Sequence, residues 1–78
     1  MPKLPIVKAK DFYGYLLKYG CIPVSTSGSH FKVSNPKTAA VAVVPIHGGR
    51  DLSKHLFAAA LSQLGIDVDD FLDFMDKN

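Results

Sequence analysis

The spacing of the apolar residues changes twice along the chain, and this change limits the fold more than any other feature. Between Lys8 and Gly20 apolar residues recur at helical spacing, whereas from Cys21 to Val44 they alternate and β-branched residues dominate. Helical spacing returns after Arg50. The sequence therefore predicts a helix, a group of short strands and then further helices.

The first strand contains Pro23, which removes a hydrogen-bond donor, so this strand is expected at an edge of the sheet. Strict alternation along it would put Ile22, Val24 and Thr26 on one face.

The second strand is expected to place Phe31 and Val33 on one face, with His30 and Lys32 on the other. The third strand, from residue 39 to 44, is apolar on both faces. This composition favours cover by helices on one side and by something else, such as a partner, on the other.

The second helix has a candidate N-cap in Asp51 or Ser53, and Gly65 is expected to end it. Its apolar stripe is expected to consist of Leu52, Leu56, Ala60 and Leu64.

The third helix carries the sharpest local signal in the chain. Asp67 is expected to cap it, with Asp70 at the third helical position. Ile66 and Phe71 occupy the positions of a hydrophobic staple. Gly20 marks the end of the first helix in the same way that Gly65 marks the second.

Strands joined by short turns and flanked by helices predict an antiparallel sheet with helices on one face. The expected fold class is α+β, an α-β-β-β-α sandwich with a short extra C-terminal helix. Seventy-eight residues suffice for one small core, so residues 1–78 are expected to form a single domain and not a large multi-domain enzyme.

Charge is distributed unevenly along the chain, although the net charge is only +2. Of the acidic residues, all Asp, only Asp11 and Asp51 precede position 67, and only one basic residue, Lys77, follows it. The first part of the chain is therefore basic and would favour a polyanion if its cations share a face. Lysines scattered over a solvated surface are the competing interpretation.

Cys21 is the one cysteine, so an internal disulfide is excluded. With no signal peptide and no long apolar run, we expect a cytoplasmic protein without a membrane segment.

His30 and Lys32 form the most chemically suggestive pair. An imidazole that titrates near neutral pH can act as a general acid or base, and a nearby ammonium can stabilise phosphate charge. RNA supplies its own nucleophile, the 2′-OH, so such a pair needs no cofactor. The competing interpretation is an exposed histidine with no chemical role.

Three further residues are candidates for contact with phosphate. His47 could also donate a proton, or it could be a turn residue bonded to backbone. Arg50 could grip a phosphate or be an ordinary loop residue. Lys54 opposes the dipole of its helix, a placement that a bound phosphate would offset.

A zinc site is the main rival chemistry. The spacing of its possible ligands matches no compact pattern, so no metal and no cofactor are expected. These possible ligands are Cys21, His30, His47 and His55.

Four motifs in order resemble those of HicA toxins from bacterial HicA–HicB toxin–antitoxin modules. The motifs are Gly28-Ser29-His30, Val44-Pro45-Ile46-His47-Gly48, Leu52 with Lys54, and Leu64-Gly65-Ile66 followed by Asp70-Phe71-Leu72. The resemblance extends from about Lys10 to Met75.

This resemblance implies a fold like that of double-stranded-RNA-binding domains and a metal-independent ribonuclease, an mRNA interferase, that cuts mRNA. It also implies that His30 is the catalytic histidine, within an RNA-binding motif that includes Gly28 and Ser29. The implied partner is a HicB-like antitoxin that covers the active face.

The chain departs from the family at Cys21, where relatives usually have an aromatic residue, and at 25–27, where they carry longer basic or polar side chains. Fewer cations near His30 would weaken phosphate binding. Two other functions therefore remain open: a non-catalytic RNA-binding module of the same fold, and a protein-interaction module.

Overall fold

The computed structural model describes residues 4–46 and 50–77. A helix, three strands and two helices follow one another in this part of the chain, which confirms the predicted order. The elements are α1 (Ala9–Tyr19), β1 (Ile22–Ser27), β2 (His30–Asn35), β3 (Ala40–Pro45), α2 (Lys54–Leu64) and α3 (Val68–Lys77). None of these helices combines the length and apolar character that crossing a bilayer requires.

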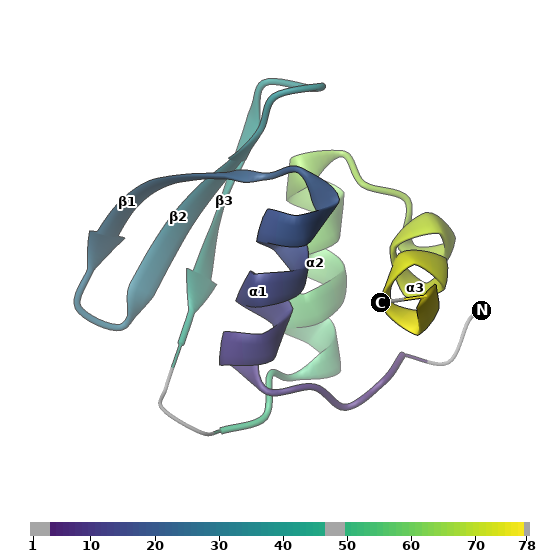
Figure 1. Cartoon of the computed structure of the whole chain (residues 1–78). Helices are drawn as coiled ribbons and strands as arrows, with labels where there is room; N and C mark the ends of the chain where they lie inside the picture. The colour runs from purple at the N-terminus through teal and green to yellow at the C-terminus, as the bar shows by residue number, and fades with distance from the viewer. Residues whose placement is uncertain (1–3, 47–49, 78) are drawn as a thin grey trace.

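The strands form one antiparallel sheet in the order β1-β2-β3. Helices α1 and α2 lie against one face of this sheet, and α3 packs on the two helices on their far side (Figure 1). β1 is an edge strand, as Pro23 predicts. The opposite face of the sheet, called the outer face below, is covered by none of the described residues.

The core is centred on three aromatic rings, one from each helix. The ring centroid of Phe12 lies 4.8 Å from that of Phe57 and 5.7 Å from that of Phe71. All three side chains are fully buried. Burial of one such side chain stabilises the fold by about 1.5–3 kcal/mol, so α3 is an integral part of the core.

The helix ends follow the sequence signals closely. The Ser53 hydroxyl accepts a hydrogen bond from the Leu56 N–H, and Gly65 ends α2 in the left-handed conformation. The Asp67 carboxylate accepts from the Asp70 N–H at 3.1 Å, which confirms the predicted cap of α3. These caps fix where α2 and α3 begin.

The prediction of strict alternation along β1 is wrong. A β-bulge follows Pro23, so that Ile22 is in register with Ser34 on the outer face while Thr26 is in register with Phe31 on the covered face. Because a bulge adds one residue to one strand, the side chains on its two sides no longer alternate in step.

The predicted stripe of α2 is also wrong at two positions, Leu56 and Leu52. Leu56 is 41% exposed, whereas the next residue, Phe57, is 1% exposed. Since Ser53 caps the helix, Leu52 precedes α2 and is buried from the preceding segment. The buried face of α2 consists of Phe57, Ala60, Leu61 and Leu64.

Candidate functional site

The alternation of β2 places the candidate catalytic residue His30 and the candidate RNA-binding residue Lys32 on the outer face. Val33 is buried and Phe31 is half-buried on the covered face, where the Phe31 ring lies 4.7 Å from the ring of Tyr13 in α1. His30 and Lys32 are both exposed on the other side of the strand. The aromatic contact therefore anchors β2 so that His30 and Lys32 point away from the helices.

The turn before His30 is held against the end of β3. Gly28 has φ 58°, a left-handed conformation that favours glycine in a two-residue hairpin turn. The Ser29 carbonyl accepts a hydrogen bond from the N–H of Ile46, and His30 is in register with Pro45. The position of the His30 backbone is thus fixed by neighbours on both sides.

The environment of Lys32 is largely uncharged. Its register partners are Ser25 on β1 and Val43 on β3. Val43 is 49% exposed and Val41, on the same face, is 42% exposed. The outer face therefore carries His30 and Lys32 beside an aliphatic region.

The start of α2 lies at the end of the molecule where the β1–β2 turn and the end of β3 are found (Figure 1). Lys54 is the first residue of α2 and is exposed. Arg50 is also exposed, and its carbonyl accepts a hydrogen bond from the Ala9 N–H at the start of α1. His47 lies outside the described residues.

The remaining candidates for metal ligation are dispersed. His55 is exposed on α2, as expected for a helix-surface residue. Cys21 is 5% exposed, and burial raises the pKa of its thiol. Within residues 4–46 and 50–77, no three or more His, Cys, Asp or Glu side chains are grouped so as to hold a metal ion.

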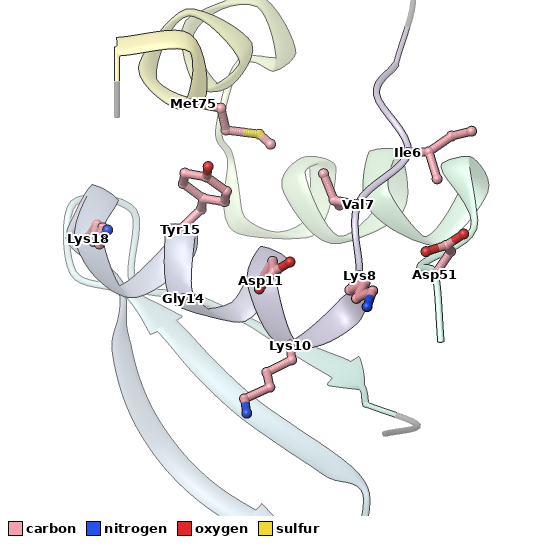
Figure 2. Close-up of a pocket in the computed structure, with 10 residues that line it drawn as sticks. All are labelled: Ile6, Val7, Lys8, Lys10, Asp11, Gly14, Tyr15, Lys18, Asp51 and Met75. Carbon is pink, nitrogen blue, oxygen red and sulfur yellow. The ribbon is translucent and has the colours of Figure 1, made fainter. Parts of the chain in front are cut away.

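One feature of the structure was not predicted from the sequence. A groove of about 680 Å³ lies beside α1, and its lining includes Lys8, Lys10 and Lys18 (Figure 2). Lys10 and Lys18 recur on one side of α1, a spacing that is visible in the sequence, whereas Lys8 precedes the helix. The walls of the groove come from segments distant in sequence.

The arrangement around His30 suits a long, flexible substrate. An exposed imidazole and an exposed ammonium stand two residues apart on one side of a strand, so one polymer chain can reach both. The imidazole can transfer a proton while the ammonium stabilises negative charge.

Comparison with known protein families gives a match over residues 9–66 to the family described as the HicA toxin of bacterial toxin-antitoxin. The matched region begins with α1, includes the whole sheet and ends after α2, so α3 lies beyond it. A search of curated proteins found no match. Because the family match covers most of the chain, including His30 and the strands that position it, the chain belongs to the HicA toxin family of bacterial toxin–antitoxin systems.

Proposed function

We propose that this toxin is a metal-independent endoribonuclease that cuts mRNA and uses His30 as its catalytic residue. The main support is the position of His30, which is exposed on the outer face beside Lys32 and lies within the region that matches the toxin family. An open sheet face accommodates a polymer better than it accommodates a small metabolite, which normally binds in a concave pocket.

The proposed reaction uses the 2′-OH of the RNA as nucleophile. This oxygen loses its proton to a base and attacks the adjacent phosphorus, and the bond from phosphorus to the 5′-oxygen of the next nucleotide breaks. The departing oxygen takes up a proton, which leaves a cyclic phosphate and a 5′-OH. His30 would serve as the base or the acid, and Lys32 would stabilise the charge on the phosphate.

The remaining predicted residues have a supporting role in this proposal. Arg50, Lys54 and, from outside the described residues, His47 would contact phosphates of the bound RNA. The Gly28-Ser29 turn would let the RNA backbone approach His30, because neither residue carries a bulky side chain.

Membership in a toxin–antitoxin family implies an antitoxin partner. We propose that a HicB-like antitoxin binds the outer face and covers His30. The exposed aliphatic side chains of Val41 and Val43 favour this proposal, because aliphatic surface next to polar groups is typical of the buried centre and polar rim of protein interfaces.

The test of the proposed activity is the incubation of antitoxin-free protein with an end-labelled single-stranded RNA in excess EDTA. A second oligonucleotide of the same sequence carries 2′-O-methyl groups and therefore has no free 2′-OH. We expect cleavage of the RNA and none of the methylated strand.

Two results would contradict the proposal in different ways. Cleavage that stops in EDTA and returns with Mg²⁺ would show that the enzyme needs a metal. Binding of both strands without cleavage of either would indicate the non-catalytic RNA-binding function.

A further inference from the structure

A groove runs along the face of α1 that points away from the core. The chain segment before α1 forms one wall and α3 the other, with Val7 and Met75 facing each other across the opening (Figure 2). The groove has a volume of about 680 Å³. Both walls lie outside the region that matches the toxin family, whereas the floor on α1 lies within it.

Cations line the groove, and none of them forms an ion pair with a carboxylate of the described residues. The lysines at positions 8, 10 and 18 are exposed, and the ion pair found among the described residues joins Lys77 to Asp73 instead. Two carboxylates, those of Asp11 and Asp51, also line the groove, so the lining carries an excess of positive charge.

Gly14 lies in the floor of the groove, in the interior of α1. Glycine is unfavourable inside a helix, yet a Cβ at this position would meet no atom of the described chain within 4 Å. Packing within this chain therefore does not require a glycine here. The missing side chain leaves the helix backbone open to close approach by a ligand.

The spacing along α1 fits a strand of nucleic acid. Lys10 and Lys18 are eight residues apart, which corresponds to about 12 Å along a helix axis. Successive phosphates of one strand advance by only about 3.4 Å in a duplex, so the two lysines would hold different phosphates. Between them, Gly14 admits the backbone, and Tyr15 and Met75 offer apolar surface to a base.

The groove connects to the end of the molecule that carries His30. The Ala9 N–H at the start of α1 bonds to the carbonyl of Arg50, and the loop that contains Arg50 leaves the end of β3. At that end, Pro45 is in register with His30. Arg50 therefore lies beside the end of the groove at which α1 begins, and Lys10 lies in the first turn of that helix.

We propose that the groove along α1 is a second RNA-binding subsite, which holds nucleotides flanking the one that reacts at His30. This proposal rests on the proposed function. It accounts for an imbalance in the fold: the register partners of His30 and Lys32 are uncharged, whereas the lysines with the spacing of separate phosphates lie on α1. An acidic protein segment is the competing occupant.

The binding test uses the His30→Ala protein, which retains the groove but does not cut its ligand. Fluorescence anisotropy with a 12-nucleotide RNA compares Lys10→Gln/Lys18→Gln with the control Lys37→Gln/Lys77→Gln, which removes two charges elsewhere. We expect the groove variant to bind about tenfold more weakly than the control. The slope of log K against log salt concentration should be less negative by about 1.4 for the groove variant. Each phosphate contact on a single strand contributes about −0.7 to this slope, and two contacts are removed.

Gly14→Gln tests the shape of the groove without removing a positive charge. Since Gln favours helix more than Gly does and the site is open, we expect an unchanged or higher Tm together with weaker binding of the 12-nucleotide RNA. In the active protein, Lys10→Gln/Lys18→Gln should raise KM for this RNA and leave kcat unchanged.

Equal RNA binding by the groove variant, the Gly14→Gln variant and the control would overturn the proposal. If the groove variant instead lost only the antitoxin, the groove would be a protein-binding site and the proposal would be wrong. Absence of RNA cleavage by the native chain would refute the proposed function but not the subsite, because the binding test does not depend on catalysis.

Discussion

The side-chain amide of Asn35, at the end of β2, donates a 2.8 Å hydrogen bond to the carbonyl of Leu64, the last residue of α2. This buried contact joins the sheet to the helix that covers it. Thr38 donates a second hydrogen bond to the same carbonyl at 2.9 Å. The end of α2 is therefore tied to the β2–β3 turn by two side chains.

We expect Asn35→Ala to lower the free energy of unfolding by about 1–3 kcal/mol, because it removes a buried donor and leaves the Leu64 carbonyl with Thr38 as its side-chain partner. Urea denaturation measures this loss. The neighbouring Ser34→Ala, on the outer face, should change stability by less than about 0.5 kcal/mol. Equal effects of the two substitutions would contradict the assigned role of Asn35.

Phe71 is the contribution of α3 to the core. Its ring lies 5.7 Å from Phe12 and 6.0 Å from Phe57, and it is fully buried although it lies beyond the family match. We expect Phe71→Ala to cost about 3–5 kcal/mol. The half-buried Leu72→Ala should cost less in the same thermal or urea unfolding measurement, and a chain cut after Ile66 should not fold stably.

Burial of Cys21 makes stability depend on pH in the alkaline range. The unfolded thiol ionises around the ordinary pKa of 9.0, whereas burial raises the pKa of the folded thiol. Above pH 9 the unfolded state therefore binds fewer protons than the folded state, and stability falls as pH rises. Below pH 9 both states hold the proton and this contribution is constant.

The comparison of the native chain with Cys21→Ala isolates this effect. Between pH 8 and 10.5, the unfolding free energy of the native chain should fall relative to that of Cys21→Ala. A difference that stays constant over this range would show that the thiol ionises alike in the folded and unfolded chains.

Val43 tests the proposed interface with the antitoxin. The side chain is 49% exposed next to Lys32, so Val43→Asp should leave the fold intact while it places a charge within an apolar contact. We expect the Kd for a HicB-like antitoxin, measured by calorimetry, to rise at least tenfold, or about 1.4 kcal/mol. Ile6→Asp, at a 71% exposed position before α1, should bind normally. Equal affinity of both variants would place the interface elsewhere.

Local signals predicted the ends of the elements well, because a cap depends on a few neighbouring residues. Asp67 and Ser53 accept the expected backbone hydrogen bonds, and Gly65 ends α2. The bulge after Pro23 was not predicted, since a bulge depends on how two strands pair. The exposure of Leu56 was missed for a similar reason, because the buried face of α2 is decided by packing against β3, α1 and α3.

The site was predictable where it follows the strand period. Phe31 and Val33 face the helices, so the alternation of β2 turns His30 and Lys32 outward. The groove beside α1 was not predictable from periodicity, because its walls at Val7 and Met75 come together only in the folded chain. Tertiary packing, and not local pattern, creates that surface.

The most direct test of the central claim is the single-turnover rate of RNA cleavage in excess EDTA for the native chain, His30→Ala and His55→Ala. General acid–base catalysis by one side chain contributes about 10²- to 10⁴-fold, so His30→Ala should lose that factor. His55→Ala, an exposed histidine on α2, should cut at the native rate. Melting curves establish that both variants are folded. Cleavage by folded His30→Ala at the native rate would contradict the assignment of His30 as the catalytic residue.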